Sequence, residues 1–155
     1  MPSAFDKDFL FLISDLARHM RTQADQRARE HGMTRAQWVI LLRLERQPNL
    51  SQNELAALAE VEPITVARLV DRLEARGLVE RHPDPKDRRV WRLRLTPAAA
   101  PVLRKIHGYR AELNDQLTAG VDRATLKTMA TGLLKLKTNL SRARSRQPGS
   151  DDVKN

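Results

Sequence analysis

The sequence predicts a mostly helical α+β fold in which one short antiparallel hairpin interrupts a series of helices. Apolar residues recur at three- and four-residue intervals over most of the chain, which is the period of a helix with one buried face. The period changes to two only near residues 78–95, where a turn rich in proline, aspartate and arginine separates two short runs. Serine or threonine followed three residues later by glutamate or glutamine marks the start of two helices.

Two helices are predicted in the N-terminal part of the chain. The first spans residues 5–30 and has one apolar face. The members of this face are Phe9, Leu12, Ile13, Leu16, Ala17 and Met20. Gly32 ends this helix, and Thr34 with Gln37 forms a capping box for the next helix, which is expected to end near Arg46.

A short helix, a turn and a longer helix follow. Ser51 and Glu54 repeat the capping-box pattern at the start of the segment NELAALAE. The longer helix has Pro63 in its first turn, where the missing amide costs little, and it ends at Gly77. The runs LVERH and VWRLRL then predict two strands joined by the turn PDPKDRR. Together these elements predict a winged helix-turn-helix domain over residues 34–96, whose second helix normally enters the major groove of DNA.

Two more helices are predicted over residues 97–140, and Asp122 has the position of a cap at the start of the second one. The apolar residues of this last helix alternate spacings of three and four, as in a helix that packs along another long helix. They are Leu126, Met129, Leu133, Leu136 and Leu140. We therefore predict a helical dimerisation region made of residues 5–30 and 97–140. Residues 141–155 have almost no apolar side chain and are predicted to be a disordered basic tail.

Composition limits the class of partner and the kinds of site. The chain has 28 Lys and Arg residues against 19 Asp and Glu residues, a net charge of +9. This charge favours a polyanionic partner, because basic side chains that bind phosphates release condensed counterions. Cysteine is absent, which excludes disulfides, thiolate zinc sites and a thiol redox switch. The four histidines lack the paired spacing of zinc ligands, so we expect no metal and no cofactor. They are His19, His31, His82 and His107.

The sequence also lacks the motifs of enzymes and of membrane proteins. It contains no phosphate-binding glycine loop, no GxSxG elbow and no recognisable pair of nucleophile and base, so we predict that the protein is not an enzyme. No run approaches the ~20 apolar residues that cross a bilayer. The N-terminal segment MPSAFDKDFLFLISDL has acidic side chains inside its apolar stretch and no cationic leader. We expect a cytoplasmic protein that does not bind membranes.

The order of the helices and several segments resemble the MarR family of transcriptional regulators. The most specific segments are LVDRLEARGLVER, DPKDRR and RLRLT, and the segments ISDLARHMR and TRAQWVILLRL look like the SlyA-like branch of the family. The resemblance covers roughly residues 10–140. It implies a homodimer on a pseudo-palindromic operator, usually a repressor, that often releases DNA when a small aromatic or phenolic carboxylate-type ligand binds.

By this resemblance, the residues expected to form the DNA-binding site lie on the recognition helix and on the wing. They are Thr65, Arg68, Arg72, Lys86, Asp87, Arg88 and Arg89. Arg68 matches the family position that reaches base edges, where a guanidinium suits guanine, and Thr65 suits a phosphate or a thymine methyl group. Arg72 can reach a phosphate, or it can pair with Asp71 or Glu74 on its own helix.

In the wing, Asp87 and Arg89 match a DxR pattern that recurs in the family. The arginine is expected to enter the minor groove, where a narrow A·T stretch deepens the negative potential. A carboxylate at a DNA-facing tip repels phosphate unless it orients an arginine or caps the turn, so Asp87 is assigned an architectural role. Lys86 and Arg88, the other two basic residues of the tip, are expected to attract phosphates. Arg92 and Arg94 can equally be only the outward face of a strand.

The resemblance also implies an effector pocket between the dimerisation helices and the winged domain. Three residues are candidates to line it: Arg21, Trp38 and Leu42. Arg21 would attract a carboxylate and Trp38 would stack on a ring. Both residues have a simpler interpretation, because Trp38 at a staple position can be a core residue and Arg21 can be a solvated helix residue.

Two other functions are compatible with the sequence. One is a global nucleoid-associated or counter-silencing DNA binder that uses no small-molecule effector, which a genome-wide count of binding sites would distinguish from a local repressor. The other is a helical interaction module whose charge serves RNA or acidic partners. The wing predicts a preference for duplex DNA with A·T-rich flanks, so comparable binding to single-stranded RNA would favour the interaction module.

Overall fold

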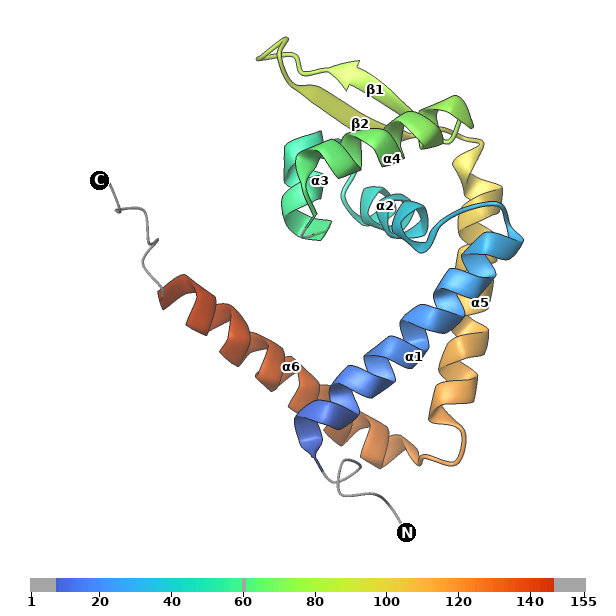
Figure 1. Ribbon diagram of the computed structural model, residues 1–155, viewed down its shortest axis with the longest axis vertical. Helices are drawn as coiled ribbons and strands as arrows, with labels where there is room; N and C mark the ends of the chain where they lie inside the picture. The colour runs from blue at the N-terminus through green and yellow to red at the C-terminus, as the bar shows by residue number, and fades with distance from the viewer. Residues whose placement is uncertain (1–7, 60, 147–155) are drawn as a thin grey trace. The chain divides into compact units, whose positions relative to one another are not determined.

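The computed structural model describes residues 8–59 and 61–146, which form six helices and one two-stranded sheet (Figure 1). The elements in chain order are α1 (Phe9–Glu30), α2 (Arg35–Arg46), α3 (Gln52–Ala59), α4 (Pro63–Ala75), β1 (Val79–Pro83), β2 (Trp91–Leu95), α5 (Ala99–Thr118) and α6 (Arg123–Arg146). The predicted fold, mostly helical with one hairpin, is confirmed. The chain divides into two compact units that meet at residues 110 and 111, and each is described by itself.

Side-chain caps determine where three of the helices begin. The hydroxyl of Thr34 accepts the Gln37 amide at 3.2 Å, and the Gln37 side chain accepts the Thr34 amide at 2.9 Å. Ser51 and Glu54 make the same reciprocal pair at 3.1 and 2.7 Å. Asp122 accepts from the amide of residue 125 at 2.9 Å. Both predicted capping boxes and the predicted cap of the last helix are therefore confirmed, since each satisfies amides that a helix start leaves without partners.

Two helix boundaries differ from the prediction. Helix α6 continues through residues 141–146, so the predicted disordered tail is wrong for these residues. The sequence there, SRARSR, is polar, but three of its six residues are arginine, which favours a helix. The remaining tail residues, 147–155, lie outside the described residues. Helix α5 begins at Ala99 instead of Pro97, because the Thr96 hydroxyl donates to the carbonyl of Gly77 and does not cap the helix.

The core of the first unit lies among α2, α3, α4, the hairpin and the start of α5. Its largest fully buried side chains are Ile40, Leu41, Leu44, Leu55, Val66, Val70, Leu73, Val79, Leu93 and Ile106. Three of these come from α4, which therefore buries one face against the core. The apolar side chains predicted along α1 and α6 are largely exposed in the single chain, for example Phe9 at 55% and Leu140 at 71%.

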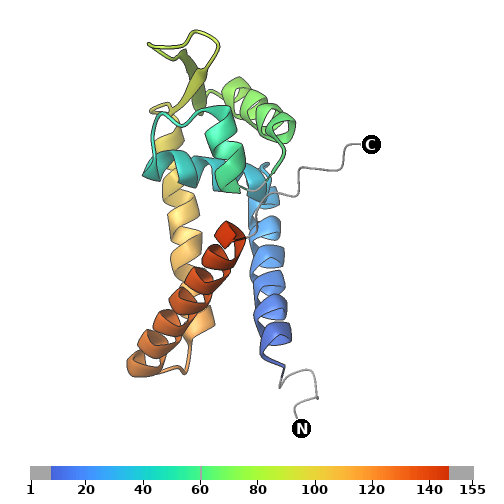
Figure 2. The ribbon, with the colours of Figure 1, turned by 90° about the vertical axis from the view of Figure 1, so that its left-hand side faces the viewer.

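The two strands form an antiparallel hairpin whose tip extends beyond the helices of the unit (Figures 1 and 2). The register pairs Arg81 with Leu93 and His82 with Arg92. Paired residues lie on the same face of a sheet and neighbouring residues on opposite faces. Arg81 therefore lies on the face that carries the buried Leu93, and Arg92 lies on the other face.

Arg92 attaches the wing to the helix-turn-helix. Its Nε donates to Oδ2 of Asp84 at 2.6 Å, and its Nη1 donates to Glu54 at 2.8 Å and to the carbonyl of Asn49 at 3.3 Å. The Asp84 carboxylate also accepts two backbone amides of the turn, at 2.7 and 3.0 Å. The hydrogen bond from Arg92, followed by those two amides, lowers the pKa of Asp84. The interpretation of Arg92 as only an outward-facing residue is therefore wrong.

Removal of the Ser51 hydroxyl should destabilise the fold, because the Glu54 amide at the start of α3 loses its acceptor. We expect Ser51→Ala to lower the free energy of unfolding by about 1 kcal/mol, measured by urea denaturation. Asn53→Ala is the control, since Asn53 is an exposed residue of the same turn and alanine favours a helix. Equal losses in the two variants would show that the cap does not stabilise α3.

Acid should weaken the attachment of the wing. A carboxylate whose pKa is lowered by folding stabilises the protein above its ordinary pKa, and this stabilisation is lost as the pH falls through the lowered value. We expect the melting temperature to fall as the pH is lowered below about 4, and to fall less in Asp84→Asn. Circular dichroism at a series of pH values would measure both. Asp115→Asn, which changes an exposed residue, is the control. If the melting temperature depends on pH in the same way in Asp84→Asn, in Asp115→Asn and in the wild type, this role of Asp84 is contradicted.

Candidate nucleic-acid interface

Helix α4 presents one polar face to solvent and buries the opposite one. Thr65, Arg68 and Arg72 are all exposed, whereas Val66 and Val70 are buried. Positions separated by three, four and seven residues lie on one side of a helix. The structure therefore brings together the three residues predicted on the recognition helix, and it places two guanidinium groups and one hydroxyl on a single accessible surface.

The acidic residues of α4 bind Arg81 of β1, not Arg72. Arg81 Nη2 donates to Oδ1 of Asp71 at 2.6 Å, and its Nη1 donates to a carboxylate oxygen of Glu74. Its Nε donates to the Gln52 side chain on α3 at 2.8 Å. These contacts use both carboxylates with which Arg72 could have paired, and the structure shows them bound to Arg81 instead.

Sequence reasoning missed Arg81, which binds the acidic side chains of α4. The available signal was its register: Arg81 occupies an inward-facing position of β1, two residues after the buried Val79 and opposite the buried Leu93. A charged residue at such a position needs several partners, because burial without hydrogen bonds is costly. The identity of those partners depends on the way α3 and α4 pack beneath the hairpin, which spacing along the chain does not reveal.

At the tip of the wing, Asp87 holds Arg89 in place. Asp87 Oδ1 accepts from the Arg89 amide at 3.0 Å and from its Nε at 3.1 Å, and Oδ2 accepts from Nη2 at 3.3 Å. The hydrogen bond from the Arg89 side chain, followed by that from its amide, lowers the pKa of Asp87. The Arg89 side chain is nevertheless 90% exposed, and Lys86 and Arg88 beside it are also exposed. Asp87 thus orients an accessible arginine, in keeping with its expected architectural role.

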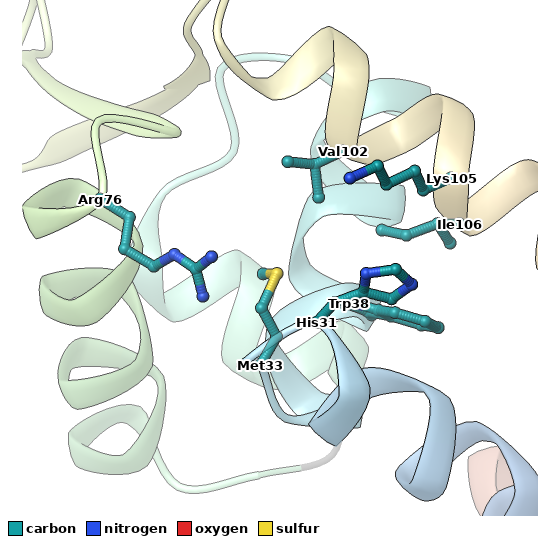
Figure 3. A pocket seen from close by; sticks show the side chains of 7 residues that line it. All are labelled: His31, Met33, Trp38, Arg76, Val102, Lys105 and Ile106. Atoms are coloured by element: carbon teal, nitrogen blue, oxygen red, sulfur yellow. The ribbon is translucent and has the colours of Figure 1, made fainter.

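Of the three predicted ligand residues, Trp38 lines the pocket described here, and Arg21 and Leu42 do not. A pocket of about 90 Å³ lies between the end of α1, α2, the end of α4 and α5 (Figure 3). It is lined by His31, Met33, Trp38, Arg76, Val102, Lys105 and Ile106. Arg21 is an exposed residue of α1, and Leu42 packs half-buried against the core. The cationic side chains that line this pocket are those of Arg76 and Lys105.

The buried indole of Trp38 forms the aromatic wall of this pocket and lies close to two other rings. Trp38 is 4% exposed, and its ring centroid lies 5.8 Å from that of Tyr109 and 6.0 Å from that of His31. Trp38 Nε1 and the Tyr109 hydroxyl are buried without a hydrogen-bond partner in the described part of the chain. Burial raises the pKa of Tyr109, although the nearby Arg27 guanidinium opposes this effect. Trp38 is thus both a core residue and a lining residue of the pocket.

Residues 8–59 and 61–146 contain neither a candidate metal site nor a candidate membrane span. Within these ranges, no cluster of three or more His, Asp or Glu residues could hold a metal ion. No helix in the same ranges combines the length and the apolar character needed to span a bilayer.

Comparison with known proteins agrees with this geometry. The model of the MarR family matches residues 31–90. The structure of a transcriptional regulator designated PA3341 is 33% identical, with a TM-score of 0.77, and the match covers 87% of this chain and 99% of that one. MarR is 28% identical with a TM-score of 0.81 and coverages of 95% and 100%. SlyA is 26% identical with a TM-score of 0.78 and coverages of 88% and 96%.

These matches extend over nearly the whole length of the solved structures, so they concern the complete fold and not an isolated helix-turn-helix. The similarity to SlyA agrees with the expected SlyA-like branch. Proteins of this family are transcriptional regulators and not enzymes, as the sequence predicted. The six helices, the wing and the exposed basic face of α4 together with these similarities establish that the chain belongs to the MarR family of DNA-binding transcriptional regulators.

Proposed function

We propose that this chain is a homodimeric repressor that reads a pseudo-palindromic operator with α4 and the wing. The observation that supports this most strongly is the pairing of an exposed arginine face on α4 with an exposed, oriented Arg89 at the wing tip. MepR of S. aureus, whose structure as a complex with DNA is known, shares this fold. A repressor of this kind would work in the cytoplasm, where it meets its operator.

Each basic residue has a distinct task in this proposal. Arg68 reads guanine O6 and N7 in the major groove through a bidentate guanidinium, and Thr65 contacts a phosphate or a thymine methyl group. Arg72, whose neighbouring carboxylates bind Arg81, contacts a phosphate. Arg89 enters the minor groove and reads its width. The other basic residues of the tip, Lys86 and Arg88, attract the backbone without regard to sequence.

The exposed apolar faces support the homodimer. Leu16 on α1 is 45% exposed, and Leu133 and Leu140 on α6 are 52% and 71% exposed. Exposed apolar side chains of this number and size mark an interaction site in a protein that dissolves in water. A second copy of the chain would cover these faces, and the two recognition helices would then meet half-sites about one helical turn apart.

The pocket beside Trp38 is the proposed site of a small effector. A single aromatic or phenolic ring would stack on the indole, and its carboxylate would face Arg76 or Lys105 in place of the predicted Arg21. The volume of about 90 Å³ is well below the roughly 300–1,000 Å³ of typical ligand sites. This small size favours the second candidate function, a global nucleoid-associated or counter-silencing DNA binder without an effector.

Loss of the wing arginine should weaken operator binding specifically. We expect Arg89→Ala to reduce the affinity for a selected genomic duplex by about 1 to 3 kcal/mol, because the minor-groove contact is lost. Arg142→Ala should have little effect at moderate salt, since Arg142 is an exposed residue near the end of α6. Selection of genomic fragments by the purified protein, followed by titration of one of them, would measure both. Equal losses would instead indicate nonspecific attraction by charge.

A small aromatic acid should weaken DNA binding if the pocket is an effector site. We expect benzoate or 4-hydroxybenzoate to reduce the affinity of wild-type protein for its selected duplex about 5- to 150-fold. Lys105→Gln should reduce this response, and Lys127→Gln on α6 is the matched control. Quenching of Trp38 fluorescence in a Trp91→Phe background would report occupancy of the pocket. Unchanged DNA affinity at saturating acid would favour the global DNA binder.

A further inference from the structure

Arg81 is more sheltered than the two carboxylates that it binds. Its side chain is 18% exposed, whereas those of Asp71 and Glu74 are 64% and 43% exposed. The guanidinium also donates to Gln52 on α3 and, at 3.4 Å, to the carbonyl of Ala67 in α4. A planar fork that binds several acceptors at once fixes their positions better than a flexible ammonium group does. Arg81 therefore holds both acidic side chains of α4 on the flank that faces the hairpin.

The positions of these acids matter because they share a helix with the proposed DNA contacts. Asp71 follows Arg68 by three residues, which is a spacing at which acidic and basic side chains pair on a helix. Without Arg81, the carboxylate of Asp71 would be free to bind the Arg68 guanidinium. Both acids would also add unneutralised negative charge close to the phosphates. In the structure, the Asp71 carboxylate instead binds Arg81.

We propose that Arg81 is a positioning residue for DNA recognition: by binding Asp71 and Glu74 it leaves Arg68 and Arg72 available to DNA. This inference rests on the proposed function, since it assumes that α4 reads DNA. Arg81 itself is not expected to touch DNA, because its guanidinium is directed to α3 and α4. Arg81 determines which charged side chains pair with one another. A residue that only stabilises the fold would not have this effect.

A double-mutant cycle tests this role. The four proteins are the wild type, Arg81→Met, the carboxylate variant Asp71→Asn/Glu74→Gln, and the combination of all three changes. Methionine has a similar length and is apolar, so it suits a position opposite Leu93. We expect Arg81→Met to weaken binding to a duplex selected by the wild type. Removing the two carboxylates should then raise the affinity of Arg81→Met for DNA. This increase should be about 2- to 100-fold larger than the change that the same two substitutions cause in the wild type.

The controls separate this effect from charge and from folding. Glu62→Gln/Glu80→Gln also removes two carboxylates from the domain, but neither is a partner of Arg81 in the hydrogen bonds described above. Its effect on DNA affinity should therefore be the same in the wild type and in the Arg81→Met background. Circular dichroism checks the fold of every variant. If Arg81→Met is not folded, the same cycle is run with Arg81→Lys, which retains one charge but not the planar fork.

Three outcomes would decide the matter. A larger rescue by the carboxylate variant in the Arg81→Met or Arg81→Lys background supports the inference. Equal factors in both backgrounds, or wild-type affinity in the Arg81 variants, would overturn it. Arg68→Ala is measured in parallel: if it keeps full affinity, the proposed function of α4 fails, whereas a loss in Arg68→Ala with an additive cycle contradicts only the role of Arg81.

Discussion

The carboxylate of Glu54 joins the start of α3 to the wing, and the geometry of the proposed DNA surface depends on this connection. Glu54 accepts the Ser51 amide at 2.7 Å and Arg92 Nη1 at 2.8 Å. The hydrogen bond from the Ser51 amide, followed by the smaller influence of Arg92, lowers the pKa of Glu54. Because Arg92 also binds Asp84 in the turn, one carboxylate fixes where a helix begins and where the hairpin lies relative to it.

A chain with 28 basic residues uses its arginines for two different purposes. Those that are sheltered bind carboxylates within the domain: the side chains of Arg81 and Arg92 are 18% and 29% exposed. Arg89, at 90% exposed, is held by Asp87 but remains accessible to a partner. Net charge therefore indicates a polyanionic partner without identifying the residues that meet it. Burial and hydrogen-bond partners make that distinction, and only the folded chain provides them.

Much of the fold could be predicted from interactions between residues that are close in the sequence. Contacts between residues that are distant in the sequence could not be predicted in this way. The pair Ser51 and Glu54 is read directly from a three-residue spacing, as is the inward face of α4. The contact between Arg81 and Gln52 joins residues 29 positions apart, so no spacing rule predicts it. The pocket residues show the same limit: Trp38 was identified, but Arg76 and Lys105 come from separate parts of the chain that meet only in the folded unit.

The position of Arg76 gives the pocket a direct physical connection to the recognition helix. Arg76 is the C-cap residue of α4, and its Nη1 donates to the carbonyl of Gly32 at 2.8 Å in the turn after α1. Figure 3 shows this side chain reaching from the end of α4 toward Met33. A ligand shifts a conformational equilibrium only by its difference in affinity for the two states. A ligand carboxylate that replaced the Gly32 carbonyl as the partner of Arg76 would break a hydrogen bond that fixes one end of α4. Such a ligand would therefore differ in its affinity for the states with and without this hydrogen bond.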